Sequence, residues 1–313
     1  MSDFRQKFYP VLPLLAALTA PMLQAAATAP ASASASAPAS APTLAVVAKV
    51  LSQQHRCSDT LLLRHAKLTT AQTSAICAEL TAIEQRFHQL LNTGRTPVAD
   101  DGNSALRANI YASRADFERF AGAHFNMPTD NGGMYLEGLP DKAGNQAEFV
   151  AYQRGSGEVW NLRHEYVHYL DGRFNLHGDF CANLHDSHAA PENCPQPAPL
   201  TPYLVWWTEG LAEYIAQGTD NPAAIALARD KAGKQQAYPL SELFNTGYIS
   251  QGGTERVYRW GYLATRYLHE QHPDKVSQLL QFLRHGDYPR YQAVVKGWGT
   301  SLDADFQRWL AQL

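Results

Sequence analysis

Residues 160–174, Trp-Asn-Leu-Arg-His-Glu-Tyr-Val-His-Tyr-Leu-Asp-Gly-Arg-Phe, carry the pattern that decides the fold. The apolar spacing over residues 159–171 is typical of a helix, and Gly172 is a natural helix end. Residues four apart lie on one face of a helix, so His164 and His168 can point at the same metal ion. The stretch therefore predicts a helix that presents two metal ligands, with two ordinary histidines on a half-buried helix as the alternative.

A catalytic zinc ion takes three protein ligands and needs a base beside it. Glu165, directly after the first histidine, can deprotonate a zinc-bound water. Residues 206–214, Trp-Trp-Thr-Glu-Gly-Leu-Ala-Glu-Tyr, predict a second helix with two carboxylates one turn apart. We expect Glu209 to be the third ligand and Glu213 to accept a hydrogen bond from a ligating imidazole. For Glu213 a solvated or ion-paired side chain is an equal alternative.

The first residues have the layout of an export signal. In residues 1–27, Arg5 and Lys7 precede a short apolar run, and small residues at 25–27 offer a cleavage site. Residues 28–43 are almost entirely Ala, Ser and Pro, which predicts a linker. We therefore expect an exported protein, secreted or periplasmic, with an uncleaved membrane anchor as the alternative.

Composition narrows the class of protein. The chain has 313 residues, 45% of them hydrophobic, and 26 basic against 29 acidic side chains give a formal net charge of −3. This balance is globular and lacks the basic excess of a dedicated nucleic-acid binder. After the signal, no apolar stretch is long enough to span a membrane. We expect a monomer without a nucleic-acid partner and, once the signal is removed, without a membrane partner.

The remaining pattern predicts an α+β fold with a small sheet against several helices and a mainly helical C-terminal half. One zinc peptidase domain should span residues 44–313, with an N-terminal part at 44–175 and a C-terminal part at 176–313. The expected helices are 44–55, 69–93 and 206–217, and the expected strands are 107–112, 134–137 and 148–153.

Four cysteines in an exported chain predict two disulfides. We expect the local pairs Cys57–Cys77 and Cys181–Cys194, because each brackets one short segment, whereas free buried thiols are less common outside the cytoplasm. The second pair closes a His-, Asn- and Pro-rich segment at residues 177–200 that predicts a surface loop.

Three histidines of that loop, His177, His185 and His188, are competing candidates for metal ligation. No helical spacing fixes them relative to one another, unlike the histidines four residues apart on the predicted helix. A polar surface loop is therefore the preferred interpretation.

Three segments together closely resemble the bacterial collagenase family of zinc metallopeptidases, which are gluzincins with a glutamate as third zinc ligand. These segments are 160–174, the stretch Asn-Gly-Gly-Met-Tyr-Leu-Glu-Gly at 131–138, and 206–213. Residues 57–101 also resemble the Gram-negative members of the family. The resemblance implies a zincin-like peptidase with a small mixed sheet that includes a substrate-binding edge strand.

The resemblance also implies roles for single residues. His164, His168 and Glu209 match the zinc ligands, and Glu165 matches the general base. Tyr258 matches the tyrosine that stabilises the oxyanion, with the tyrosine one turn further along as the fallback.

Two further sites follow from the same resemblance. Gly132 and Gly133 match paired glycines on a strand that holds the substrate backbone, with a simple turn as the alternative. Glu137 matches a carboxylate that binds a structural Ca²⁺ together with carbonyls of the loop at 172–178, although a surface glutamate is equally expected.

The function implied is an exported zinc metalloendopeptidase that hydrolyses peptide bonds in gelatin, collagen-derived or Gly/Pro-rich peptides. One catalytic Zn²⁺ is the expected cofactor, and a polypeptide is the expected partner. The chain ends soon after the expected catalytic unit, so we expect no accessory domains. The alternatives are an aminopeptidase-type gluzincin and a catalytically inactive collagen-binding protein that kept the fold.

Overall fold

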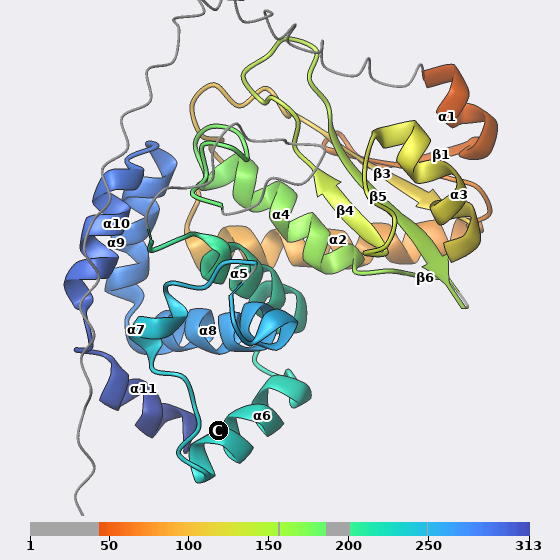
Figure 1. Cartoon of the computed structure of the whole chain (residues 1–313). Coiled ribbons are helices and arrows are strands. Elements are labelled where there is room, and N and C mark those ends of the chain that lie inside the picture. Colours follow the sequence, from red (N-terminus) through yellow and green to blue (C-terminus); the bar gives the residue numbers. More distant parts are fainter. Residues whose placement is uncertain (1–43, 156, 186–200, 249) are drawn as a thin grey trace, which may run out of the picture. The chain divides into compact units, whose positions relative to one another are not determined.

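A mixed β-sheet forms the centre of the N-terminal half (Figure 1). The computed structural model describes residues 44–313 except 156, 186–200 and 249. Within these residues the strand order is β1-β2-β3-β5-β4, and β6 pairs with β5. The pairs β2–β3 and β3–β5 are parallel, whereas β1–β2 and β4–β5 are antiparallel. The strands are β1 (Gln53–Ser58), β2 (Leu61–His65), β3 (Leu106–Tyr111), β4 (Gly133–Leu136), β5 (Ala147–Arg154) and β6 (Glu158–Val159).

Strand β5 is buried on both faces because the sheet separates two apolar cores. Successive side chains of a strand point to opposite faces. Phe149 and Ala151 belong to the larger core, which also contains residues of α2 and α4. Val150 and Tyr152 belong to the smaller core, with residues of α1 and α3. The helices concerned are α1 (Leu44–Val50), α2 (Thr70–Leu91), α3 (Arg114–Phe125) and α4 (Leu162–Phe174).

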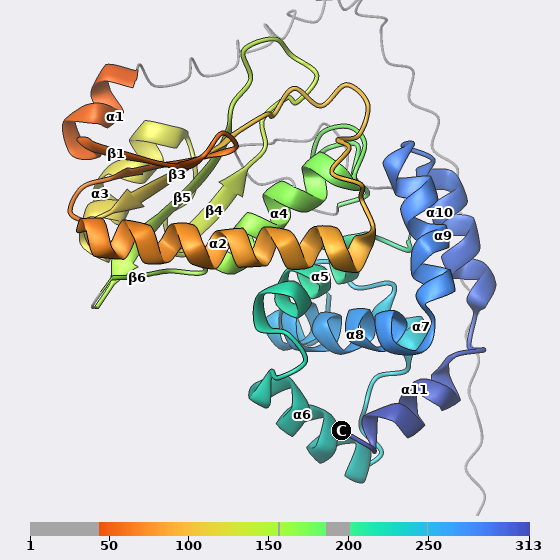
Figure 2. The ribbon, with the colours of Figure 1, turned by 180° about the vertical axis from the view of Figure 1, so that it is seen from behind.

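The C-terminal half is helical, as the sequence predicts. Helix α5 contacts α4 of the N-terminal half as well as α8 and η1, and α2 contacts both α4 and α5 (Figure 2). The segment η1 is a π-helix, a form often found at functional sites. The elements are α5 (Val205–Gln217), α6 (Pro222–Gly233), α7 (Leu240–Leu243), η1 (Glu255–Trp260), α8 (Gly261–Gln271), α9 (Pro273–Arg284), α10 (Tyr288–Trp298) and α11 (Asp303–Leu310).

Helices α5 and α8 touch at a pair of glycines. A Cβ atom built on Gly210 would lie 2.3 Å from the carbonyl oxygen of Gly261, a distance that real Cβ atoms do not reach. A Cβ atom on Gly261 would lie 3.3 Å from the Cα atom of Gly210. The crossing therefore depends on the absence of a side chain at residue 210, directly after Glu209.

One predicted helix is wrong in extent, and one strand is missing from the prediction. The helix predicted at 44–55 ends at Val50, and residues 53–58 form strand β1 instead. Strand β2, Leu61–His65, lies between the two predicted helices, in a stretch to which the sequence pattern assigns no element. Its pairing with β3 joins segments far apart in the sequence, which local pattern does not reveal.

Gly172 does not end the helix, because α4 continues to Phe174. The glycine serves a different purpose: a Cβ atom there would lie 2.3 Å from a carboxylate oxygen of Glu137. A side chain at residue 172 would displace this carboxylate.

The predicted disulfide Cys57–Cys77 is confirmed and joins β1 to α2. Cys181 is also disulfide-bonded, while Cys194, its predicted partner, lies outside the described residues, as do the predicted signal peptide (1–27) and linker (28–43). In the part of the chain that the structure describes, none of the helices has the length and apolar character needed to traverse a bilayer.

Candidate metal centre

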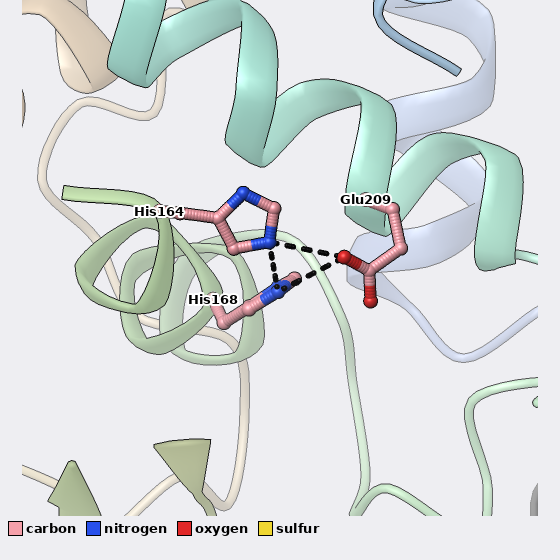
Figure 3. Close-up of side chains that lie close together, drawn as sticks. All are labelled: His164, His168 and Glu209. Carbon is pink, nitrogen blue, oxygen red and sulfur yellow. Dashed lines mark hydrogen bonds and ion pairs between the residues drawn. The ribbon is translucent and has the colours of Figure 1, made fainter. Parts of the chain in front are cut away.

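His164 and His168 on α4 converge with Glu209 on α5 (Figure 3). The two histidine Nε2 atoms are 3.0 Å apart. Oε2 of Glu209 lies 3.0 Å from Nε2 of His164 and 3.5 Å from Nε2 of His168. The structure thus brings together the three side chains that the sequence pattern predicted as one ligand set.

The donor set and its spacing fit a zinc ion. Two imidazole nitrogens and one carboxylate oxygen are typical of catalytic zinc sites. With metal–ligand bonds of about 2.0–2.1 Å, neighbouring ligand atoms of a tetrahedron lie roughly 3.3 Å apart. The three separations at this cluster, 3.0, 3.0 and 3.5 Å, fall around that value.

Two hydrogen bonds, on the atoms that face away from the cluster, orient His164 and Glu209. Nδ1 of His164 donates to Oε1 of Glu213 over 3.0 Å, which leaves its Nε2 facing the cluster. The Tyr248 hydroxyl donates to Oε1 of Glu209 over 2.7 Å, so that Oε2 of the same carboxylate faces the histidines. Such partners fix the tautomer of an imidazole and the rotamer of a carboxylate.

Burial and charge act against each other at this cluster. Burial would raise the pKa of Glu209, but the neighbouring histidines hold it well below its usual range. Burial would likewise lower the pKa of His164, but hydrogen bonds to Glu209 and Glu213 raise it to about 10. Without metal the cluster therefore keeps a proton on His164, and a metal ion must release this proton when it binds.

Glu165 lies beside the cluster without belonging to it. Its Oε2 accepts a hydrogen bond from the backbone N–H of Tyr135 on β4, and its Oε1 accepts one from the side-chain amide of Asn161. Both bonds are 3.0 Å long. A carboxylate held at both oxygens next to a metal site is suited to act as a base toward water.

One cavity of about 1160 Å³ contains the cluster and Glu165. Tyr258 of η1 lines it, with its ring centroid 5.7 Å from that of His164. The charge of Glu209, together with burial, raises the pKa of Tyr258 above its usual range. Its hydroxyl therefore stays protonated at neutral pH and can donate a hydrogen bond.

Comparison with known proteins agrees with this geometry. The sequence profile of the collagenase family matches residues 35–309. The chain belongs to this family. It is 42% identical over 264 residues to a microbial collagenase of Vibrio alginolyticus and 40% identical over 271 residues to one of Vibrio parahaemolyticus. It is 22% identical over 222 residues to collagenase ColT of Clostridium tetani.

These matches cover 83%, 86% and 68% of this collagenase-family chain. They cover only 30%, 30% and 20% of the respective relatives. The chain thus spans about a third or less of the length of the curated relatives it matches. The likeness to the Gram-negative members, expected from the sequence, is confirmed at about 40% identity.

In this collagenase-family chain β4 is an edge strand, at the end of the strand order. Gly132 has a φ angle of +90°, and a Cβ atom there would lie 3.0 Å from the indole ring of Trp160. A Cβ atom on Gly133 would lie 2.9 Å from the carbonyl oxygen of Val150 and 3.0 Å from the same indole. The paired glycines therefore accommodate Trp160, a reason that sequence pattern did not supply.

Of the two other predicted residues, Glu137 lies at the cavity wall and Tyr262 does not. Glu137 is buried, lines the cavity and faces the backbone of Gly172, within the loop expected to provide calcium ligands. The fallback tyrosine, Tyr262, is not placed to act: it is buried in the core and donates to the carbonyl oxygen of Gly218.

Among the described residues of the histidine-rich loop, His185 departs from the surface-loop prediction. His185 is buried, lines the cavity and stacks between the rings of Phe180 and Tyr248. Burial lowers its pKa to about 4, so it is neutral at physiological pH. His177 instead lies 3.9 Å from Asp100, and His188 lies outside the described residues.

Sequence reasoning missed four residues that the structure places in the cavity wall. Tyr135 and Asn161 donate hydrogen bonds to Glu165, Tyr248 donates one to Glu209, and Trp160 covers the paired glycines. Asn161 had a detectable signal, because it precedes the base by one helical turn. Trp160 also precedes His164 by one helical turn, whereas Tyr135 and Tyr248 have no fixed spacing from the motif.

Proposed function

We propose that this chain is a zinc metalloendopeptidase. The observation that carries the proposal is the convergence of His164, His168 and Glu209, with Glu165 held beside them by two hydrogen bonds. The family match supports the same class of reaction. In the part of the chain that the structure describes, this is the one cluster of three such side chains found to suit a metal ion.

The mechanism follows from where each side chain lies. A zinc ion held by the three ligands would supply a Lewis acid that polarises the scissile carbonyl and lowers the pKa of water. Glu165 accepts a proton from the attacking water and passes it to the leaving amine. Tyr258 keeps its phenolic proton and donates a hydrogen bond to the developing oxyanion.

The proposed substrate is an extended peptide that adds to β4. This edge strand carries the glycine pair and borders the same cavity as Glu165. Peptides commonly bind by strand addition to an exposed sheet edge. Gelatin, collagen-derived peptides and Gly/Pro-rich peptides are the proposed substrates, in keeping with the names of the Vibrio relatives.

Further assignments belong to the same proposal. Residues 1–27 are an export signal, residues 28–43 a linker, and residues 44–313 one peptidase domain that acts as a monomer outside the cytoplasm. The carboxylate of Glu137 binds a structural Ca²⁺ with carbonyls of the adjoining loop. Mass spectrometry of the exported protein and calcium titration of its thermal unfolding test these two points.

The central test is digestion with matched controls. The mature protein is incubated with gelatin and with a Gly-Pro-containing peptide blocked at both ends, with and without a zinc chelator. We expect internal cleavage that the chelator abolishes and that added Zn²⁺ restores. Cleavage of free but not blocked peptides would indicate an aminopeptidase, and binding without cleavage would indicate an inactive collagen-binding protein.

Native collagen provides a second substrate comparison. Its backbone is committed to a triple helix, so extracting one strand costs free energy along the bound stretch. Gelatin offers the same bonds already unwound. We expect much faster cleavage of gelatin than of triple-helical collagen below its melting temperature. Equal rates on both would contradict the proposed requirement for an extended single strand.

A further inference from the structure

We propose that Arg256 is a positioning residue for the metal centre. Its guanidinium group holds the segment that carries Tyr248 through hydrogen bonds to Glu242, Thr246 and Gln251, and so keeps the Tyr248 hydroxyl on Glu209. The hydrogen-bond partners of Arg256 are Glu242, Thr246 and Gln251 rather than the three candidate ligands, so it would act through the tyrosine. The inference rests on the proposed zinc function, because its effect is exerted on a zinc ligand.

Four hydrogen bonds connect Arg256 to this segment. Its Nε donates to the hydroxyl of Thr246 over 3.0 Å. Its Nη1 donates to Oε1 of Glu242 over 2.9 Å and to the carbonyl oxygen of Gln251 over 3.4 Å. Its Nη2 donates to the carbonyl oxygen of Glu242 over 2.8 Å. One side chain therefore holds the segment at its start, middle and end.

Burial makes the bond between Arg256 and Thr246 hard to replace. Arg256 and Thr246 are 7% and 1% exposed, so water has little access to their polar atoms. The guanidinium group also lies over the ring of Tyr238, 5.0 Å from its centroid. A planar fork of donors can satisfy acceptors on both sides at once, which the single ammonium of lysine cannot do.

Tyr248 lies within the segment that Arg256 holds. Its hydroxyl donates to Oε1 of Glu209 over 2.7 Å, and its ring stacks on that of His185 at an interplanar angle of 8°. With Oε1 engaged, Glu209 offers Oε2 to the cluster, 3.0 Å from Nε2 of His164. If the tyrosine moved away, Oε1 would be freed and the carboxylate would lose the hydrogen bond that fixes its orientation.

Arg256 also belongs to η1, two residues before Tyr258. Arg256 thus anchors Tyr248, which donates to Glu209, and it lies two residues before Tyr258, which is proposed to face the oxyanion. This placement sets the requirement for the test: zinc affinity has to be measured apart from turnover, since turnover responds to both tyrosines.

The experiment is a double-mutant cycle on zinc affinity, measured by competition with a chelator of known affinity. The variants are Arg256→Ala, Tyr248→Phe and the double variant. We expect each single change to weaken zinc binding roughly 10- to 100-fold, the range found when partners of metal ligands are removed. The double variant should bind zinc as Tyr248→Phe does, because the arginine acts only through the tyrosine hydroxyl.

A matched control and a milder variant accompany the cycle. Arg266, on α8, donates to Glu270 and to the carbonyl oxygen of Thr219, away from the metal ligands, so Arg266→Ala should leave zinc affinity unchanged. Thr246→Val removes one partner of Arg256 while keeping the side-chain shape, and should weaken zinc binding in the same direction. This variant also keeps the inference testable if Arg256→Ala does not fold.

The visible absorption of the cobalt-substituted protein gives a second readout. Because it reports the geometry of the ligands, Arg256→Ala and Tyr248→Phe should shift it alike. Additive losses of zinc affinity in the double variant would overturn the inference, as would unchanged affinity in both Arg256→Ala and Thr246→Val. A wild-type chain that binds no zinc would overturn the proposed function as well, which distinguishes the two failures.

Discussion

Replacing Gly210 by alanine should disturb both stability and the candidate metal centre. The added Cβ atom would lie 2.3 Å from the carbonyl oxygen of Gly261, whereas real contacts of this kind stay above 3.0 Å. Helices α5 and α8 must therefore separate locally by at least 0.7 Å, the difference between these two distances. Such overpacking costs about 1–3 kcal/mol, partly offset by up to about 1 kcal/mol from the better helix propensity of alanine.

The measurement is thermal or denaturant unfolding of three glycine variants that span a graded series. Gly210→Ala should lower the free energy of unfolding by about 1–2 kcal/mol, which for a domain of this size lowers the melting temperature by roughly 2–8 °C. Gly261→Ala, whose Cβ would meet backbone atoms at 3.3 Å, should have a smaller effect. Gly233→Ala, with nothing within 4 Å, is the control and should be neutral or slightly stabilising.

The same displacement should also lower catalytic activity. Glu209 precedes Gly210 on α5, and Tyr258 lies just before Gly261, so separating the helices moves the third ligand away from the tyrosine. Peptide turnover should fall in Gly210→Ala and persist in Gly233→Ala. If Gly210→Ala melts at the same temperature as Gly233→Ala, the close helix crossing described above is not a feature of the folded protein.

Four further predictions concern single sites. Glu165→Gln should keep its zinc and its fold but lose at least about 100-fold in kcat, because the amide lacks the basic oxygen. Zinc content and kinetics check this, and near-normal hydrolysis would exclude Glu165 as the base. Glu209→Ala should lose both zinc and activity, since two protein ligands remain, and a wild-type metal content would place the third ligand elsewhere. Replacing both Cys57 and Cys77 by serine should lower the free energy of unfolding by on the order of 3 kcal/mol, estimated from the sequence separation of 20 residues. If the variant and the wild type had the same free energy of unfolding under oxidising as well as reducing conditions, this prediction would be contradicted. Burial lowers the pKa of His269 to about 4, so the unfolded chain takes up a proton that the folded chain resists as the pH falls from about 6.5 to 4. Stability should therefore drop by up to about 3 kcal/mol over that range, and His269→Phe should flatten this part of the pH profile; an unchanged slope in the variant would assign the effect to other groups.

Local sequence pattern could predict which candidate metal ligands share a helix face, because helix geometry fixes their spacing. The four-residue spacing of His164 and His168 determines their shared face, and the helix at 205–217 is long and apolar enough to be recognised. Glu213 follows by the same reasoning, one turn after Glu209. These assignments need no knowledge of how the chain folds back on itself, beyond the packing of two helices.

The residues that support the ligands depend on tertiary structure and could not be predicted in this way. Tyr248 lies in a turn between α7 and η1, 39 residues from Glu209 in the sequence, so the tertiary fold has to bring the two together. Strand β2 was missed because its parallel pairing with β3 joins segments far apart in sequence. Gly172 was misassigned as a helix end because its reason is contact with Glu137, which comes from another element.

The contact between Trp160 and the paired glycines has a consequence for engineering the cleft. Attempts to alter substrate preference usually enlarge or shrink one residue at a time. Here Gly132 and Gly133 lie directly against the indole, so a larger residue at either position has no room while the tryptophan stays. A smaller residue at 160 would not by itself make room at 133, because a Cβ atom there would also lie 2.9 Å from the backbone carbonyl oxygen of Val150. The glycine pair is therefore a fixed part of this edge of the cleft, and variants that keep both glycines are the ones expected to fold.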